Sequence, residues 1–377
     1  MSKRIRILDG GGLEIVDPGL ESLDLLQSLD PLFRVRRAPL LGFGEPRFLS
    51  SRLSGCGIAK ELLPEQPEDF LWKLHRKAME IDHGKNLVKI CMEGEASILD
   101  LKIEISKRLL KSCRLCAHRC EVDRLAEKRG ICGLGTEAIV AEHFVHIAEE
   151  APVNPSLVLS LAGCGLRCSY CQQWRILNPK KVQGNKLDVS LWEKLDWNEA
   201  RSIQFVGGNP DESLYAILQF LAGAPATWKL PVVWNTHGYC TPETLDLLNG
   251  VVDVFLPDFK YGKGDCARNL SGAPDYFHTA KTTIAQMLNQ NIPVIVRVLV
   301  LPGHFDCCHK PVLEALKGMT RRENLTVSIR GQYSPDFRIT KKDGIMARRP
   351  FAEEVQRVRS MAMELELVTV EEKRRTE

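Results

Sequence analysis

Two patterns of apolar residues alternate along the second half of the chain. Short apolar runs rich in β-branched residues are separated by longer segments whose apolar residues recur at helical spacing, as in Leu214, Ile217, Leu218 and Leu221. The runs predict strands over 157–161, 203–206, 231–235, 252–258, 293–301 and 325–329, with helices over 211–222, 274–289 and 350–366 among them. Strand–helix alternation indicates a parallel sheet, and six units are too few for an eight-unit barrel. We therefore expect an α/β fold, a partial (β/α)6 TIM-like barrel, over residues 151–370.

The remaining chain divides into three parts. Residues 1–96 are an N-terminal extension of unclear fold in which only 70–81 has clear helical spacing. Residues 97–150 form a cysteine-rich segment, introduced by apolar residues that suit a helix up to residue 111. A short strand or turn is expected around Phe144. Residues 371–377 are a charged tail.

Composition excludes several classes of protein. The formal charge of +3 on 377 residues is too small to indicate binding to nucleic acid or to an anionic membrane. No apolar run is long enough to span a bilayer, and the first residues lack the apolar core of a signal peptide. We expect a cytoplasmic protein. Its 13 cysteines are an odd number, so they cannot all be paired, and clustered thiols in a reducing compartment favour metal or redox chemistry.

Three of these cysteines lie on one short loop. Cys164, Cys168 and Cys171 directly follow the first predicted strand, with three and two residues between them. A cubane iron–sulfur cluster has four irons, so three thiolates leave one iron open to bind a substrate or cofactor. The alternatives are a zinc knuckle, which would need a fourth ligand close by, or three thiols that pack in the core.

The stretch 163–171, with the aromatic Tyr170 just before the third cysteine, resembles the signature loop of the radical S-adenosylmethionine (SAM) superfamily. The resemblance implies a [4Fe-4S] cluster on Cys164, Cys168 and Cys171 whose open iron binds the methionine moiety of SAM. It implies reductive cleavage of SAM to a 5′-deoxyadenosyl radical that abstracts hydrogen from a substrate. The protein would supply the position of the cofactor and a dry cavity.

Polar residues follow the other predicted strands, where the functional face of a parallel barrel is expected. Gly207 and Gly208 would let the backbone approach a ligand closely, and with Asn209 they resemble the superfamily's Gly-Gly-Glu motif, with Asn in place of Glu. Segments 235–238, 257–261 and 296–302 resemble those of pyruvate formate-lyase activating enzymes, and the overall likeness covers about 113–335. It implies that SAM or the substrate contacts Tyr170, Gly207, Gly208, Asn209, Asn235, Asp258, Lys260 and Arg297, with Asp258, Lys260 and Arg297 as the candidate catalytic residues. For each polar residue the alternative is a structural cap or ion pair.

Two further groups of cysteines remain. Four of them, at the spacing Cys113-x2-Cys116-x3-Cys120-x11-Cys132 among several cations, predict a second metal site holding zinc or an auxiliary iron–sulfur cluster. The alternative is a cysteine-rich loop that packs without metal. Adjacent Cys307 and Cys308 could ligate a cluster or exchange hydrogen with a substrate radical, or could belong to a loop of small residues.

These observations lead to one main hypothesis and one alternative. The main hypothesis is a radical SAM oxidoreductase that acts on a protein, as an activating enzyme does, or on a small molecule, and receives electrons from a flavodoxin or ferredoxin. Glycyl-radical activases carry auxiliary cysteines after the signature loop, whereas the four extra cysteines here precede it. The alternative is a non-catalytic iron–sulfur or zinc protein that serves electron transfer or as a scaffold.

Overall fold

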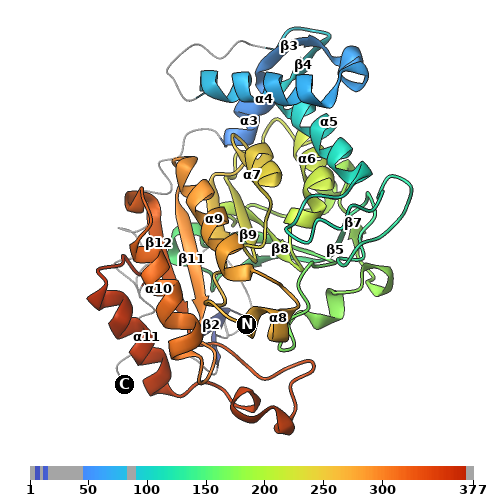
Figure 1. Cartoon of the computed structure of the whole chain (residues 1–377). Helices are drawn as coiled ribbons and strands as arrows, with labels where there is room; N and C mark the ends of the chain where they lie inside the picture. Colours follow the sequence, from blue (N-terminus) through green and yellow to red (C-terminus); the bar gives the residue numbers. More distant parts are fainter. Residues whose placement is uncertain (1–4, 9–11, 16–45, 83–90, 371–377) are drawn as a thin grey trace.

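A central sheet of eight strands organises the computed structural model, which describes residues 5–8, 12–15, 46–82 and 91–370 (Figure 1). The strand order is β12-β11-β10-β9-β8-β6-β5-β7. Their bounds are β5 Ile139–His146, β6 Ser156–Leu161, β7 Asn185–Lys186, β8 Ser202–Gly207, β9 Val232–Thr236, β10 Val254–Pro257, β11 Val294–Leu299 and β12 Leu325–Arg330.

Six strands, β6, β8, β9, β10, β11 and β12, pair in parallel and in chain order. Each corresponds to one of the six predicted strands, because an apolar run buried on both faces suits the middle of a parallel sheet. All six residues of β6 are buried, for example. The mixed α/β class with a parallel-rich central sheet is confirmed, whereas closure into a barrel stays a prediction.

The sheet also contains two strands outside that set of six. β5 pairs antiparallel with β6, and the short β7 pairs antiparallel with β5 at the edge. The side chain of Phe144 on β5 is 44% exposed, so this strand has one solvated face and lacks a continuous apolar run. The expected short strand near Phe144 is therefore present, and it joins the main sheet.

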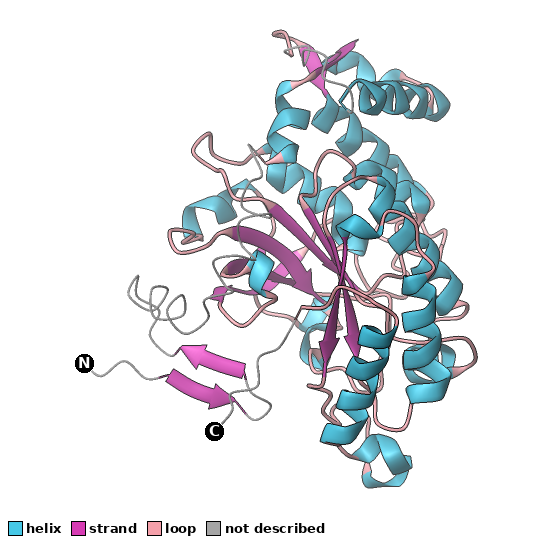
Figure 2. Ribbon diagram, turned by 90° about the vertical axis from the view of Figure 1, so that its left-hand side faces the viewer, coloured by secondary structure: helices cyan, strands magenta, loops and turns pink. Residues whose placement is uncertain are grey.

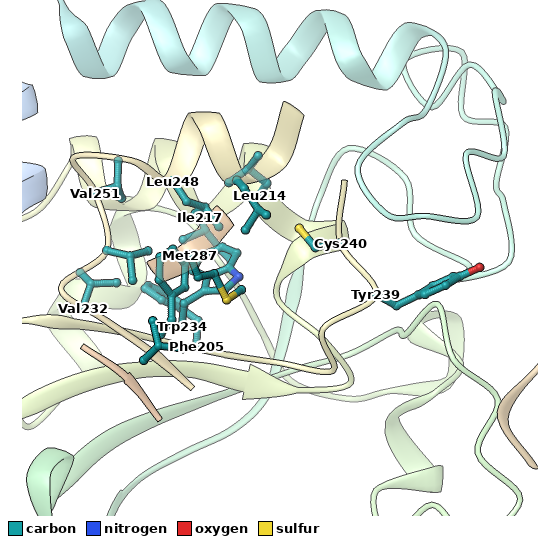
Figure 3. Packing of buried hydrophobic residues seen from close by; sticks show 14 of the residues in the cluster. Phe205, Leu214, Ile217, Val232, Trp234, Tyr239, Cys240, Leu248, Val251 and Met287 are labelled. Carbon is teal, nitrogen blue, oxygen red and sulfur yellow. The ribbon is translucent and has the colours of Figure 1, made fainter. Parts of the chain in front are cut away.

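Helices lie mostly to one side of the central sheet (Figure 2). They are α6 Leu214–Ala222, α7 Pro242–Leu248, α8 Cys266–Ser271, α9 Tyr276–Asn289, α10 Lys310–Lys317 and α11 Ala352–Glu364. Figure 3 shows Phe205 and Trp234 of the sheet packed with Leu214 and Ile217 of α6, all four fully buried. The apolar helix face predicted from the sequence therefore covers the parallel strands.

The N-terminal part of the described chain forms a small layer beside the sheet. It contains the elements α3 (Arg47–Leu53), β3 (Gly55–Ala59), α4 (Glu68–Asp82) and β4 (Glu95–Ser97), whereas the antiparallel hairpin of β1 (Ile5–Leu8) and β2 (Gly12–Ile15) lies apart from it (Figure 2). Helix α5 (Ile98–Lys111) follows and begins with a capping box between Ser97 and Asp100. The helices expected over 70–81 and up to 111 are present. The charged tail 371–377 lies outside the described residues, and the predicted domain boundaries stay predictions.

A buried polar contact joins α4 and α5 to the end of helix α7. The Lys102 ammonium of α5 lies 2.8 Å from Nε2 of His75 on α4 and donates to the carbonyl of Asn249 at 2.7 Å. Lys102 carries only donors, so Nε2 of His75 accepts and the ring is neutral. Burial, with Lys102 as the second cause, lowers the pKa of His75 from 6.5 to about 2.

Acid should therefore destabilise the fold through His75. Below pH 6.5 the unfolded chain protonates this histidine and the folded chain does not, so the free energy of unfolding falls as pH decreases. Between pH 7.5 and 5.5 the expected loss is about 1.4 kcal/mol, measured by urea unfolding. His75→Leu should remove this part of the pH dependence, and the exposed His278→Gln serves as the control. An unchanged slope in His75→Leu would contradict the assignment.

Candidate active site

The three predicted cluster cysteines lie on the loop that follows β6, at the carboxyl edge of the parallel strands. Cys164, Cys168 and Cys171 line a cavity of about 260 Å³. The other predicted site residues that line it are Tyr170, Gly207, Gly208, Asn209, Asn235, Asp258, Lys260 and Arg297. The structure thus brings the residues predicted to surround the cofactor together in one cavity. Their individual roles stay predictions.

Close backbone packing fixes the start of the cysteine loop. A Cβ atom on Gly208 would lie 1.8 Å from the carbonyl oxygen of Gly163, and one on Gly207 would lie 2.3 Å from the nitrogen of Leu161. Both Gly163 and Gly207 have positive φ, at 86° and 105°, which favours glycine. The sequence predicted that the backbone at Gly207 and Gly208 approaches a ligand closely. In the structure this backbone packs closely against β6 and the start of the cysteine loop, and both glycines also line the cavity.

The buried carboxylate of Glu212 holds Gly165, which follows Cys164 in the cysteine loop. Oε1 of Glu212 accepts a hydrogen bond from the backbone N–H of Gly165 at 2.8 Å. The carbonyl of Gly165 contacts Nε2 of His118 at 2.9 Å, so His118 donates from that nitrogen. There is no room for a side chain at Gly165, because its Cβ would lie 2.5 Å from Glu212. The loop is therefore fixed before any cofactor binds.

Glu212 is itself matched by hydrogen-bond donors. Asn209 donates to Oε2 at 2.6 Å, and Nε2 of His237 lies 3.3 Å from Oε1. Since Nδ1 of His237 accepts from the N–H of Tyr239, the ring presents a proton to Glu212. Burial by itself raises the pKa of Glu212, but His237 and Asn209 lower it overall, so the carboxylate is ionised.

Asn209 is hydrogen-bonded to both Glu212 and His237. Its amide nitrogen donates to Glu212, and its carbonyl oxygen accepts from the N–H of His237 at 2.9 Å. Both ends of the Asn209 amide are thus engaged within the chain, while the residue also lines the cavity, and its contact with SAM stays a prediction. A carboxylate is still present beside the motif, three residues later at Glu212. Glu212 is thus a site residue that the sequence analysis did not single out, and an acidic residue so close to the Gly-Gly-Asn motif is the signal that could have indicated it.

Hydroxyl groups support the second cysteine. Tyr170 contacts Tyr261 at 2.6 Å, Tyr261 contacts Ser271 at 2.5 Å, and the Ser271 hydroxyl donates to Sγ of Cys168 at 3.0 Å. Ser271 is the last residue of α8, so this chain of hydrogen bonds links the cysteine loop to the loop after β10. Hydrogen bonds to a sulfur tune a bound metal centre.

Asp258 and Lys260 form an ion pair after β10. Nζ of Lys260 lies 2.6 Å from Oδ2 of Asp258. Burial tends to lower the pKa of Lys260, but Asp258 and the neighbouring thiols raise it overall, so the ammonium is charged. The pair offers one cation and one carboxylate to the cavity.

Arg297 meets two carboxylates that the sequence analysis did not assign to it. It binds Glu149 and donates to Glu150 from Nε at 2.8 Å and from Nη2 at 2.7 Å. Glu150 is fully buried and also accepts from the hydroxyl of Ser328 at 2.9 Å. Burial raises its pKa, but Arg297 lowers it overall. Glu149 and Glu150 thus supply the negative charge that a buried Arg297 requires. Arg297 can contact SAM or substrate only through the part of its side chain that lines the cavity.

Asn235 provides a donor directed at the cavity. Its Nδ2 is buried and has no hydrogen-bond partner among the described residues. A buried amide without a partner costs about 1–3 kcal/mol, which a bound ligand that accepts a hydrogen bond would offset. The residue lies at the end of β9, beside Leu256 of β10.

The upstream cysteines pack against the outside of the cysteine loop. Cys113, Cys116 and Cys132 are buried and Cys120 is partly exposed. Arg124 donates to Sγ of Cys113 at 3.7 Å. Within the described ranges these four sulfurs do not form a group whose members all lie within 4.8 Å, the spacing that suits one ion. The second metal site on these residues stays a prediction.

A family model described as the radical SAM superfamily matches residues 158–316. The chain is also 32% identical over 311 residues to the uncharacterized protein MJ0674 of Methanocaldococcus jannaschii. The aligned region covers 78% of this chain and 86% of that protein. The chain belongs to the radical SAM superfamily. Enzymes of this superfamily cleave SAM, and their cofactors are a [4Fe-4S] cluster and SAM.

Solved structures of SuiB from Streptococcus suis are also similar to this radical SAM chain. The structure of SuiB alone matches 59% of this chain, with 13% sequence identity and a TM-score of 0.37. The structure of SuiB bound to SAM matches 56% of this chain, with the same identity and TM-score. Bound to the precursor peptide SuiA, it matches with 14% identity and a TM-score of 0.37 over 57%. This chain spans 48% of each SuiB chain.

The residues present fit the cofactors of the superfamily. Three thiols on a preformed loop match the ligand set of a cluster with one open iron. Asn235 supplies an unpaired donor, and Asp258 and Lys260 supply one charge of each sign.

No helix in the described part of this radical SAM chain has the length and hydropathy needed to cross a bilayer.

Replacing Gly208 should disrupt the cysteine loop. Gly208→Ala places a Cβ atom in contact with backbone, which cannot move aside cheaply, so we expect a loss of at least about 2 kcal/mol in unfolding free energy. Iron bound after anaerobic reconstitution should also fall. Gly318→Ala is the matched control, because its Cβ would meet its nearest atoms at 3.6 Å. Equal stability and iron content in the two variants would contradict the packing argument.

Proposed function

We propose that this chain uses Cys164, Cys168 and Cys171 to bind a [4Fe-4S] cluster and binds SAM in the adjoining cavity. The observation that carries the proposal is the convergence of the three thiols with Asn235, Asp258 and Lys260 in one cavity. The cluster, when bound, supplies the electron that cleaves the sulfonium of SAM, and the chain then directs hydrogen abstraction from a substrate. The expected electron donor is a flavodoxin or ferredoxin.

The chain's own residues would divide the work of holding SAM. Asn235 can donate to a hydroxyl or carboxylate oxygen, since its amide nitrogen has no other described partner. Lys260 can bind a carboxylate, and Asp258 can accept from an ammonium or hydroxyl group. Glu212, His118 and Ser271 keep the cysteine loop in place from behind. Arg297 contributes positive potential at the cavity wall, reduced by its two glutamates.

We propose that the substrate is a protein, as for the pyruvate formate-lyase activating enzymes that the segments 257–261 and 296–302 resemble. The support is the sequence likeness at the strand ends that line the cavity, including Asp258, Lys260 and Arg297. A small-molecule substrate is the competing outcome. The two differ in where the abstracted hydrogen atom originates.

SAM cleavage tests the first proposal. Full-length protein reconstituted anaerobically with iron and sulfide, then reduced in the presence of SAM, should form 5′-deoxyadenosine, measured by chromatography. The variant with Cys164, Cys168 and Cys171 all changed to Ala should lose at least about 100-fold of this activity, whereas Cys56→Ala should retain it. Iron incorporation without 5′-deoxyadenosine, even when cell extract supplies substrate, would support the non-catalytic alternative.

Isotope transfer tests the second proposal. Extract of source cells grown in D2O is separated by ultrafiltration into protein and small-molecule fractions, and each is incubated with the reduced enzyme and unlabelled SAM. Because hydrogen abstracted from carbon ends in 5′-deoxyadenosine, mass spectrometry should find deuterium with the protein fraction and none with the filtrate. Deuterium derived from the filtrate alone would contradict a protein substrate.

A further inference from the structure

Three metal-ligand side chains from two different loops meet outside the cavity. Cys266 is the first residue of α8, His304 follows β11, and Cys307 lies in the π-helical turn Phe305–His309. One ligand atom from each lies within 4.8 Å of the other two, and the described residues contain no second group of three or more that is this close. Cys266 thus converges with residues 38 and 41 positions later in the chain, at the spacing of metal ligands.

The sulfur positions suit a single ion. Sγ of Cys266 and Sγ of Cys307 are 3.9 Å apart. Two thiolates bound at about 2.3 Å to a tetrahedral Zn²⁺ are separated by about 3.8 Å. An iron–sulfur cluster instead distributes its thiolates over separate irons, which requires wider spacing.

The hydrogen bonding of His304 leaves one ring nitrogen, Nε2, available to a metal. Nδ1 of His304 lies 2.8 Å from the carbonyl oxygen of Pro302, and because a carbonyl only accepts, Nδ1 carries the proton. Nε2 then has a free lone pair. A backbone carbonyl that fixes the tautomer in this way is the usual partner of a metal-bound histidine. His309 differs, because its Nε2 accepts from the N–H of Leu301.

The burial of the group gives both a rigid base and an entry path. Cys308 is fully buried, and its sulfur lies 3.8 Å from that of Cys307. Cys307 is exposed, while Cys266 and His304 are partly exposed. The base is packed closely, since a Cβ on Gly262 would lie 2.2 Å from the carbonyl oxygen of Cys307. An ion can therefore enter from solvent and bind to side chains that the fold already holds.

We propose that Cys266, His304 and Cys307 bind one Zn²⁺ ion, with a fourth position open to Cys308 or water. Each thiol releases its proton to solvent as it binds, and no electron is transferred. The ion would join the loop after β10 to the loop after β11. It would also fix the start of α8, whose last residue, Ser271, donates to Sγ of Cys168.

Site-resolved alkylation tests the proposal on the unaltered full-length chain. The protein is purified anaerobically, stripped with a chelator and treated with iodoacetamide, with and without added Zn²⁺. Mass spectrometry of peptides should show alkylation of Cys266 and Cys307 slowed at least tenfold by Zn²⁺, because a bound thiolate is a poorer nucleophile. Cys91, which is also partly exposed, serves as the internal reference and should react at the same rate in both. Equal rates at Cys307 with and without Zn²⁺ would overturn the proposal.

Metal counting provides an independent measurement. Cys307→Ser and His304→Gln should each bind about one Zn²⁺ per chain fewer than the wild type, whereas Cys91→Ser and His278→Gln should bind as many. Because each variant is compared with the wild type, any zinc bound to the other cysteines contributes equally to both and does not affect the difference. Unchanged zinc in both site variants, or a Cys266–Cys307 disulfide in the anaerobically purified protein, would refute the site. SAM cleavage measured on the same samples separates this result from the proposed function.

Discussion

The carboxylate of Glu212 is the interaction on which the active site depends. It is almost fully buried, and an ionised group in that position is tolerated only when hydrogen bonds replace its water. Those hydrogen bonds come from the cysteine loop at Gly165, from the end of β8 at Asn209 and from the loop after β9 at His237. Three successive carboxyl ends of parallel strands are thus held in register by one charged side chain. Movement of any one of them would leave part of a buried charge unmatched.

The opposite wall of the cavity is built in the same way. Glu150 is fully buried beneath Arg297, and strands β11 and β12 contribute Arg297 and Ser328 to it. Removing one partner from such a group leaves an uncompensated buried charge, which is strongly destabilising. Both walls are therefore rigid before any ligand enters. The thiols of the cysteine loop and the amide of Asn235 also line the cavity, and they remain able to bind a ligand. The charges of Glu212, Glu150 and Arg297 therefore serve the structure, whereas the thiols and Asn235 are available for binding.

The sequence predicted best what depends on local pattern. Six parallel strands follow from six apolar runs, because burial on both faces needs no knowledge of the partner strand. The gathering of Asn235, Asp258 and Lys260 follows from topology alone, since parallel strands place their carboxyl ends together. Pairing between distant side chains could not be predicted this way. Glu150 and Arg297 are separated by 147 positions, and Glu212 and Gly165 by 47. No periodicity links such residues, so the partners of Arg297 and of the cysteine loop are seen only in the structure.

The position of the cysteine-rich segment before the signature loop has a structural explanation that does not require metal. His118 contacts the carbonyl of Gly165, and Arg124 donates to the carbonyl of Glu212 at 2.9 Å. Arg167 of the cysteine loop in turn binds the carbonyl of Ile131. These contacts join backbone groups on both sides, so the segment and the loop are packed as one unit. Because the segment contacts the cysteine loop that lines the cavity and the backbone of Glu212, which holds that loop, it acts as a positioning layer for the active site. Whatever its cysteines bind, its loss would leave Gly165 and Glu212 without part of their hydrogen bonding.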